Sequence, residues 1–512
     1  MYFAPSVLFR RRIAGVAVIG LVLITTVFGV PAPAAPATTE LEGRWIGTVR
    51  HGTNTGFLAL EFQRQPDTRI STRLWMPDVN AFGSAVGWAI VKDGQLMVPE
   101  ANISLSLNAG VLTGSLMSPD LTFSARRTVD PLPAEPEPPA ADTGPEPAWT
   151  YHAKASLWAG PVVADGLAFV GDVSGVFHAV DVTTGRGRWS FDAGAPLFGA
   201  PSLAGEAICF VSDNGQLFKL ARADGRELWR AAIGGSGIRS VPAPGATEWD
   251  YAAAAPVMVN DIIYVGSADG VFHALDAVSG DPLWSFKTGG KIRAAALIAG
   301  TRIFVGSSDH FVYALDRRTG ALLWRFDNGS PDTTAPMLAG DRVVIGTRDR
   351  ALLYALDAAT GTRRWTVDYW LSWVESTPVL VDGLLYVGAS DSRRVRVIEP
   401  ETGRVRWAAQ VWGWTWGTPL VIGDTVYYGT AGAPEYFITQ RASLGALDRR
   451  TGALKWRKPL PLLAKSYVAG ITGSLAYADG KILAANLDGT LAAYDVAHPA
   501  ALPPPPPTVT AP

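Results

Sequence analysis

The chain repeats one short pattern at intervals of 40 to 55 residues, and this repetition limits the folds it can adopt. The pattern reads Ala-x-Asp-x-x-Thr/Ser-Gly-x-x-x-Trp, and its complete copies end at Trp189, Trp284, Trp324, Trp365 and Trp456. Two degenerate copies, in which Ala221 and Glu399 replace the Asp, end at Trp229 and Trp407. A period near forty residues, built from four short apolar runs and hairpin turns, is typical of a β-propeller blade.

The two ends of the repeat region predict how the ring closes. Trp149 precedes Trp189 by one repeat but has no complete motif before it, whereas the last copy, Leu491–Val496, has no tryptophan after it. Joining them gives an additional blade whose outer strand comes from the N-terminal side and leaves no exposed sheet edge. We therefore predict an all-β chain with an eight-bladed β-propeller over residues 149–497, preceded by a small β domain.

The recurring Gly, Asp and Trp of the repeat can each be explained by a structural role. Gly provides the positive φ of a tight turn, Asp accepts hydrogen bonds from turn amides, and Trp packs on the neighbouring blade. The predicted packing tryptophans are Trp149, Trp189, Trp229, Trp284, Trp324, Trp365, Trp407 and Trp456. His178 and His273 lie three residues before the motif Asp, where Phe218, Tyr313 and Tyr354 stand in other blades. A slot that accepts Phe, Tyr or His favours packing over metal binding.

The remaining segments differ in composition. Residues 1–34 combine Arg10–Arg12, an apolar run and A-x-A sites, which indicates a signal peptide; an uncleaved membrane anchor is the alternative. Residues 41–128 alternate in polarity and predict a small all-β domain, in the form of a half barrel. Residues 129–148 form a Pro-rich linker, and residues 498–512 a disordered Pro-rich tail.

Composition excludes several functions. The chain has 44 Lys and Arg against 46 Asp and Glu, so no basic surface for nucleic acid is expected. Cys209 is the only cysteine, which rules out an intramolecular disulfide, and its apolar neighbours predict a buried thiol. No nucleophile with a base and no metal-ligating cluster stands out from the repeats, so no catalytic or metal residues are assigned.

A second group of tryptophans lies outside the repeat motif, in the loops that lead from an outer strand to the next inner strand. Both long insertions, Ser236–Tyr251 and Ala433–Arg441, should emerge on this same face of the propeller. We predict that this face binds a partner or ligand, with Arg293 and Glu375 as its polar members. The alternative is that the tryptophans cover the inner strands and plug the channel. The predicted face comprises Trp158, Phe198, Trp249, Tyr251, Arg293, Trp370, Trp373, Glu375, Trp412, Trp414 and Trp416.

The motif between Trp149 and Val496 resembles the repeat of pyrroloquinoline quinone (PQQ) dehydrogenases and of their non-catalytic relatives, such as the propeller lipoprotein of the outer-membrane β-barrel assembly machinery. A dehydrogenase of this family commonly needs two adjacent cysteines or a C-x-x-C-H haem site, and Cys209 alone provides neither. The resemblance thus favours a non-catalytic scaffold without cofactor. The alternative is a PQQ- and calcium-dependent dehydrogenase that oxidises alcohols or sugars.

The signal peptide and the resemblance together predict where the protein acts and with what. We expect an exported monomer, in the periplasm or outside the cell, that binds an envelope or secreted protein or a glycan. No nucleic-acid partner is expected.

Overall fold

The computed structural model describes residues 38–52, 54–93, 95–138, 144–235, 250, 254–331, 334–370, 372–436, 438–463 and 466–496. The predicted signal peptide and the predicted tail lie outside these residues. The chain divides into two compact units, and the boundary in the described part falls between Glu135 and Pro136. Within the described residues, no helix has both the length and the apolar character needed to cross a membrane.

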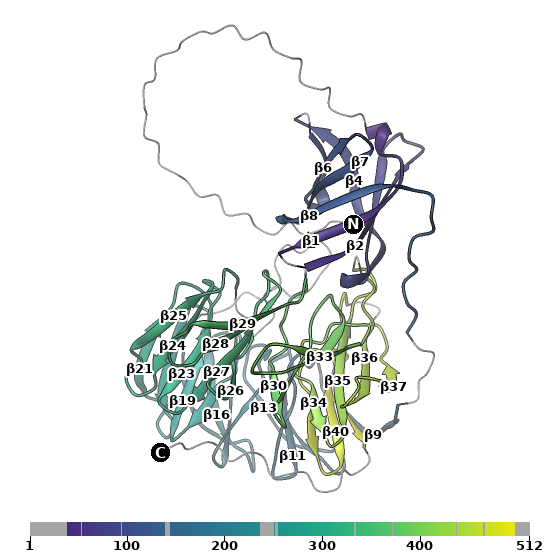
Figure 1. Cartoon of the computed structure of the whole chain (residues 1–512). Helices are drawn as coiled ribbons and strands as arrows, with labels where there is room; N and C mark the ends of the chain where they lie inside the picture. Colours follow the sequence, from purple (N-terminus) through teal and green to yellow (C-terminus); the bar gives the residue numbers. More distant parts are fainter. Residues whose placement is uncertain are drawn as a thin grey trace, which may run out of the picture. The chain divides into compact units, whose positions relative to one another are not determined.

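The first unit contains a closed eight-stranded antiparallel barrel (Figure 1). Three short 3-10 helices accompany it: η1 (Thr38–Leu41), η2 (Pro77–Val79) and η3 (Pro99–Ala101). Its strands are β1 (Gly43–His51), β2 (Asn54–Arg64), β3 (Ile70–Met76), β4 (Ala81–Lys92), β5 (Gln95–Val98), β6 (Ile103–Asn108), β7 (Val111–Leu116) and β8 (Ser118–Thr128).

The prediction of a half barrel is wrong, because β1 pairs with both β2 and β8 and the sheet closes on itself. Closure brings β1 close to β8 at Gly47, where an added Cβ would lie 1.9 Å from the backbone oxygen of Ser124. The alternating residues of β6 show the usual one-sided burial of a barrel strand. Trp45 fills the interior at 1% exposure.

The second unit is the predicted propeller, and its described strands form eight antiparallel sheets of the blade type (Figure 1). Blade 1 contains β10 (Val162–Ala164), β11 (Leu167–Gly171), β12 (Val176–Asp181) and β13 (Gly187–Asp192). Blade 2 contains β14 (Ser202–Ala204), β15 (Ala207–Val211), β16 (Gln216–Ala221) and β17 (Glu227–Ala232). Blade 3 contains β18 (Val257–Val259), β19 (Ile262–Gly266), β20 (Val271–Asp276) and β21 (Pro282–Lys287). Blade 4 contains β22 (Leu297–Ala299), β23 (Arg302–Gly306), β24 (Phe311–Asp316) and β25 (Leu322–Asp327).

The remaining blades follow the same order from inner to outer strand. Blade 5 contains β26 (Met337–Ala339), β27 (Arg342–Gly346), β28 (Leu352–Asp357) and β29 (Arg363–Asp368). Blade 6 contains β30 (Val379–Val381), β31 (Leu384–Val387), β32 (Arg394–Ile398) and β33 (Val405–Gln410). Blade 7 contains β34 (Leu420–Ile422), β35 (Thr425–Gly432), β36 (Ser443–Asp448) and β37 (Leu454–Pro459), and β38 (Ala469–Gly470) pairs with β35. Blade 8 contains β39 (Ala476–Ala478), β40 (Lys481–Ala485), β41 (Thr490–Asp495) and β9 (Pro147–His152).

Blade 8 confirms the predicted closure. Its outer strand β9 comes from the N-terminal side of the propeller and pairs antiparallel with β41, placing Trp149 opposite Ala493. The inner strands β10 and β39 contact each other across the same junction. The two ends of the repeat region therefore complete one sheet, which leaves no unpaired edge at the junction.

The motif tryptophans lie between blades. Seven of the eight motif indoles pack on the motif glycine of the next blade, where an added Cβ would come within 2.4 to 3.0 Å of the ring at Gly185, Gly225, Gly280, Gly320, Gly361, Gly403 and Gly452. Indole Nε1 groups also donate to backbone oxygens of the next blade at 2.8 to 3.2 Å, as in Trp149, Trp189, Trp229, Trp324, Trp365 and Trp407. The indole of Trp456 instead lies against Gly144, in the segment that the sequence predicted to be linker.

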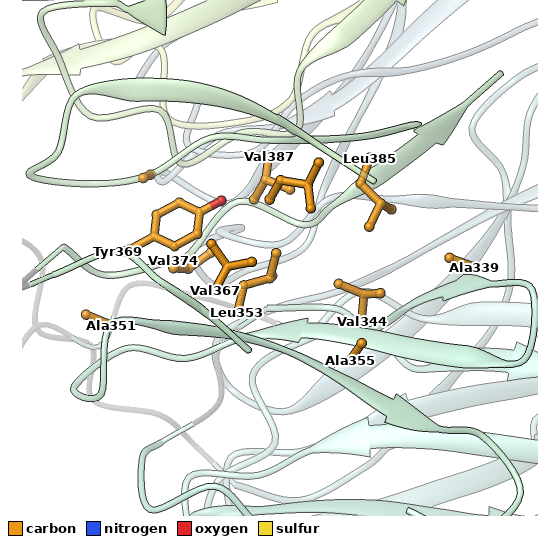
Figure 2. Close-up of a cluster of buried hydrophobic side chains, with 12 residues drawn as sticks. Ala339, Val344, Ala351, Leu353, Ala355, Val367, Tyr369, Val374, Leu385 and Val387 are labelled. Atoms are coloured by element: carbon orange, nitrogen blue, oxygen red, sulfur yellow. The ribbon is translucent and has the colours of Figure 1, made fainter. Parts of the chain in front are cut away.

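The motif Asp residues cap their turns as predicted. Oδ1 of Asp316 accepts hydrogen bonds from the backbone N–H groups of Arg318 and Thr319 and from the Thr319 hydroxyl. Between blades, the core is apolar: Leu353 of blade 5 and Leu385 of blade 6 share a buried cluster with Tyr369 (Figure 2). Each blade interface thus combines polar turn caps at the outside with apolar packing further in.

The two histidines that lie three residues before the motif Asp differ in their hydrogen bonds. His178 is buried, and its ring nitrogens are hydrogen bonded to Asp172 Oδ2 and to the Tyr151 hydroxyl, both at 3.0 Å. His273 Nε2 has no hydrogen-bond partner among the described residues, and burial lowers the pKa of this imidazole. Both fill interfaces between blades, as expected, but His178 is also part of a buried hydrogen-bonded chain that sequence reasoning missed.

Candidate functional site

The predicted binding face is assembled by loops that connect an outer strand to the next inner strand. We call its described aromatic members the aromatic rim: Trp158, Phe198, Trp370, Trp373, Trp412, Trp414 and Trp416. They come from the loops β9–β10, β13–β14, β29–β30 and β33–β34. The predicted residues Trp249 and Tyr251 lie outside the described residues.

Part of the rim is one continuous aromatic cluster. Trp414 and Trp416 are stacked with ring centroids 4.9 Å apart, and Tyr436 meets Trp414 edge-on at 5.0 Å. Trp158 packs against this cluster from the far end of the repeat region, and its ring lies 5.9 Å from Phe198. The ring closure therefore brings together side chains from blades 6, 7, 8 and 1.

Exposure divides the rim into two groups. Trp412, Trp414 and Trp416 are buried, at 7%, 0% and 6% exposure, so these three predicted members of the binding face do not present their rings at the surface. Trp414 and Trp416 lie in a buried cluster with Ala431, Val468 and Leu487, and the backbone packs closely beside them at Gly413, where an added Cβ would lie 2.2 Å from the Arg441 oxygen. These three fit the alternative in which tryptophans cover the inner strands. Trp158, Phe198, Trp370 and Trp373 are half-buried and keep part of their rings at the surface.

A half-buried carboxylate underlies the cluster. Asp391, in the β31–β32 turn, accepts hydrogen bonds from Trp414 Nε1 at 2.7 Å, from the Tyr436 hydroxyl at 3.1 Å and from Gln440 Nε2 at 3.4 Å. Burial raises the pKa of Asp391 to about 6 even though the Trp414 and Tyr436 hydrogen bonds oppose this shift. Sequence reasoning missed Asp391, although an Asp after the Ser of this turn departs from Ala268 and Ser308 in the same position of other blades.

The predicted polar member Glu375 lies in a second group with Arg348 and Trp373. The Arg348 guanidinium lies over the Trp373 ring, 4.0 Å from its centroid, and its Nε is 3.7 Å from Glu375 Oε1. The Glu375 side chain is 5% exposed. Stacking of Arg on an indole fixes the ring while the guanidinium balances the nearby carboxylate. Trp373 is therefore a rigid, half-buried aromatic group beside a buried charge pair.

Arg293, the other predicted polar member, is buried in an ion pair. Its Nη2 lies 2.5 Å from Asp250 Oδ2, and Lys291 Nζ reaches the same oxygen at 2.7 Å. Burial favours a higher pKa for Asp250, but the hydrogen bonds from Arg293 and Lys291 hold it below its usual value. Asp250 thus joins the C-terminal end of the first long insertion to the loop between blades 3 and 4. Arg293 is engaged in this contact.

The chemistry of the site suits recognition. It offers half-buried aromatic rings, a stacked guanidinium and two deeply placed carboxylates, Glu375 and Asp391. Searched over the described ranges, the chain has no group of three or more His, Cys, Asp or Glu side chains that could hold a metal ion. The single thiol, Cys209, is buried, and burial raises its pKa to about 12.

The variant Asp391→Asn tests how the Asp391 carboxylate contributes to the pH dependence of stability. An acid whose pKa is raised by folding keeps its proton in the native state while the unfolded chain loses it, so native stability falls as pH rises from about 4 to about 6. The variant has no carboxyl group at this position and does not lose this stability. The unfolding free energy of the variant minus that of the original chain should therefore rise by roughly 3 kcal/mol between about pH 4 and about pH 6. Urea denaturation of both proteins between pH 4 and 7 measures it. A difference that stays flat with pH would contradict the assignment.

The family model described as outer membrane protein assembly factor BamB matches residues 140–247, 234–348 and 308–502, which is more than half of the chain. The protein of that name from Yersinia pestis is 27% identical over 150 residues, covering 28% of this chain and 36% of the relative. Serine/threonine-protein kinase AfsK of Streptomyces coelicolor is 35% identical over 185 residues, covering 31% of this chain and 22% of the kinase. The chain thus spans a minor part of these relatives.

Solved structures agree on the fold. The computationally designed Ika8 protein superimposes with a TM-score of 0.54 at 18% identity, covering 67% of this chain and 98% of that one. Quinohemoprotein alcohol dehydrogenase from Comamonas testosteroni gives 0.52 at 16% identity, covering 70% of this chain and 77% of that one. Such low identities show the architecture alone. The resemblance inferred from the repeat is confirmed, and the chain belongs to the family of PQQ-like propellers described as outer membrane protein assembly factor BamB.

Proposed function

We propose that this protein is an exported, non-catalytic scaffold of the cell envelope that binds a protein partner through the half-buried part of the aromatic rim. The family description supports an envelope protein as partner, because the relatives of that name are assembly factors of the outer membrane. The predicted signal peptide supports export. Under this proposal the propeller needs no cofactor.

One observation carries the proposal: the rim has aromatic rings beyond those that hold the blades together, and four of them remain half-buried. Trp158, Phe198, Trp370 and Trp373 lie between outer and inner strands, away from the motif positions. Large aromatic rings held in place by neighbours are the side chains that dominate protein interfaces. Trp373 is the clearest case, because Arg348 stacks on it and fixes its orientation.

Trp373→Ala is expected to weaken partner binding at least tenfold, because removing a central aromatic anchor commonly costs 2 kcal/mol or more. Affinity capture from the native envelope fraction, followed by quantitative mass spectrometry, identifies the partner, and titration with that purified partner gives the affinity. Leu323→Ala is the matched control, since Leu323 is an exposed apolar residue on the outer strand of blade 4. Equal loss in both variants, or none in Trp373→Ala, would oppose the proposed surface.

The dehydrogenase alternative is tested directly. Purified protein is incubated with PQQ and calcium, and dye reduction is followed with alcohols and sugars as substrates. The scaffold proposal predicts no turnover above a sample without protein. Robust turnover would replace it with the catalytic function.

A further inference from the structure

The junction between blades 7 and 8 departs from a packing pattern that the interfaces of blades 1 and 2, 3 and 4, and 4 and 5 share. In those interfaces, the residue three positions before the motif Asp lies against the residue two positions after the motif Trp of the preceding blade. The rings of Phe218 and Phe191 meet edge-on at 5.5 Å, and Tyr313 with Phe286 and Tyr354 with Phe326 do the same at the same distance.

Interfaces without that aromatic pair fill the slot by other means. In blade 6 the slot residue is Arg396, whose guanidinium lies over the Tyr369 ring at 3.8 Å. In blade 7 the slot residue is Gly445, and the ring of Tyr428 occupies the space, since an added Cβ would lie 2.3 Å from it. A flat group therefore fills the slot in each of these interfaces.

In blade 8, neither of the two corresponding positions carries a ring. Its slot residue is Ala492, and the residue that faces the slot from blade 7 is Lys458. A cavity of about 260 Å³ lies at this place, lined by both residues and by neighbours from β9, β37 and β41. An apolar cavity of about 150 Å³ already accepts benzene, so this one has room for a six-membered ring with substituents.

The wall of the cavity is polar and presents both donors and acceptors. Lys458 Nζ donates to Glu146 Oε1 at 2.7 Å, and the Glu146 side chain is 80% exposed, at the edge. Asn486 also lines the wall, at 6% exposure.

The remaining lining adds a carboxylate, Asp488, the hydroxyls of Thr150 and Thr490, and a phenol. Burial raises the pKa of Tyr494 to about 12, so this phenol keeps its proton at neutral pH. Pro147, Pro459 and Pro461 add apolar surface to the lining. Hydroxyl groups match such a wall best, because each one both donates and accepts, and their carbon frame can lie on the proline rings.

We propose that the cavity at the blade 7–blade 8 junction binds a hydroxyl-rich, uncharged ligand of the size of one sugar ring. The junction is formed by the end of β37, by β9 and by the β40–β41 turn, and it shares no residue with the aromatic rim. The proposal is therefore independent of the partner surface, and either one can fail alone.

Ala492→Tyr is the decisive variant, because it places in blade 8 the ring that blades 4 and 5 carry in the same slot. Ligand-observed NMR with saturation transfer is recorded with glucose, N-acetylglucosamine and free arginine as probes at millimolar concentration, where single-ring ligands commonly bind. The original chain should receive saturation transfer with at least one sugar, and Ala492→Tyr should lose at least tenfold in affinity while its melting temperature stays equal or rises. Val278→Tyr, at an exposed turn of blade 3, should bind as the original does.

A second variant covers the case in which Ala492→Tyr does not fold. Lys458→Met keeps the apolar stem and removes the ammonium donor, so sugar binding should weaken several-fold. The proposal is overturned if neither sugar binds the original chain, if Ala492→Tyr binds sugar as tightly as the original, or if arginine binds and the sugars do not. The last outcome would point to a basic side chain of a protein as the occupant.

Discussion

Gly320→Ala is expected to lower the free energy of unfolding of the propeller by about 2–5 kcal/mol. The residue has φ +72°, and an added Cβ would lie 2.4 Å from the indole of Trp284. The left-handed backbone costs about 1–2 kcal/mol for a residue other than glycine, and forcing a methyl group against a packed ring adds about 1–3 kcal/mol. Urea denaturation followed by tryptophan fluorescence measures the loss.

Gly300→Ala is the matched control within the same blade. Gly300 also has a positive φ, +56°, but an added Cβ would meet nothing within 4 Å. Its cost should be limited to the backbone term of about 1–2 kcal/mol. The excess in Gly320→Ala measures how strongly an indole holds the next blade. Equal costs for the two variants would show that contact between indole and glycine contributes little to blade packing.

His178→Phe is expected to destabilise the propeller by about 3 kcal/mol, although Phe218 fills the equivalent slot of blade 2. His178 Nε2 is hydrogen bonded to Asp172, which is 0% exposed, and loss of a bond to a buried charged group costs about 1.5–3 kcal/mol or more. Burial works to raise the pKa of Asp172, but the hydrogen bonds from His178 and Ser174 hold it below its ordinary 3.8. The variant leaves Oδ2 of this buried carboxylate without its partner, while Oδ1 keeps its hydrogen bonds from Ser174 and Val176.

Another blade interface of the same chain shows which residues should restore the stability that His178→Phe loses. The interface of blades 1 and 2 has Phe191, Ser212 and Phe218 where the interface of blades 8 and 1 has Tyr151, Asp172 and His178. The triple variant Tyr151→Phe, Asp172→Ser, His178→Phe should therefore recover most of the stability that His178→Phe alone loses. Thermal and urea unfolding of the single and triple variants measure this coupling. If the triple variant is no more stable than the single one, the hydrogen-bonded chain is not what stabilises this interface.

The same contact has a defined pH dependence. A carboxylate whose pKa is lowered by folding stabilises the native state above the ordinary pKa, and this contribution disappears as pH falls through the lowered value. The difference between the original chain and the triple variant should therefore shrink below pH 3.8. This trend is opposite to that expected for Asp391, whose pKa is raised, so the two sites can be distinguished by pH alone.

The propeller could be predicted from the sequence because its determinants are local and repeated. The turn of Asp316 and Gly320 and the tryptophan that follows lie within one short segment, and the same solution recurs in each blade. Closure through Trp149 could also be predicted, since each end of the repeat region lacked the part that the other supplied. The barrel was only partly predicted, because alternation of polarity specifies strands but not whether β1 returns to β8.

The tryptophan content of the connecting loops predicted where the candidate site lies, and the structure then showed which of its rings are buried. An excess of tryptophans in the connecting loops identified the rim, but the burial of Trp414 depends on how closely Gly413 approaches Arg441. The carboxylate of Asp391 was missed because its partners, Trp414 and Tyr436, come from different loops. Hydrogen bonds between residues this far apart leave no periodic signal in a single sequence.

The sequence by itself determined the repeat, the number of blades and the turn chemistry, since these follow from residues close together in the chain. Only the tertiary structure decided which tryptophans are covered, that Gly144 receives the indole of Trp456, and that Ala492 leaves a cavity beside Lys458. The physical reason is that burial and unfilled volume are properties of surfaces in contact. Across the closing junction those surfaces come from opposite ends of the propeller, as in the contact of Lys458 with Glu146.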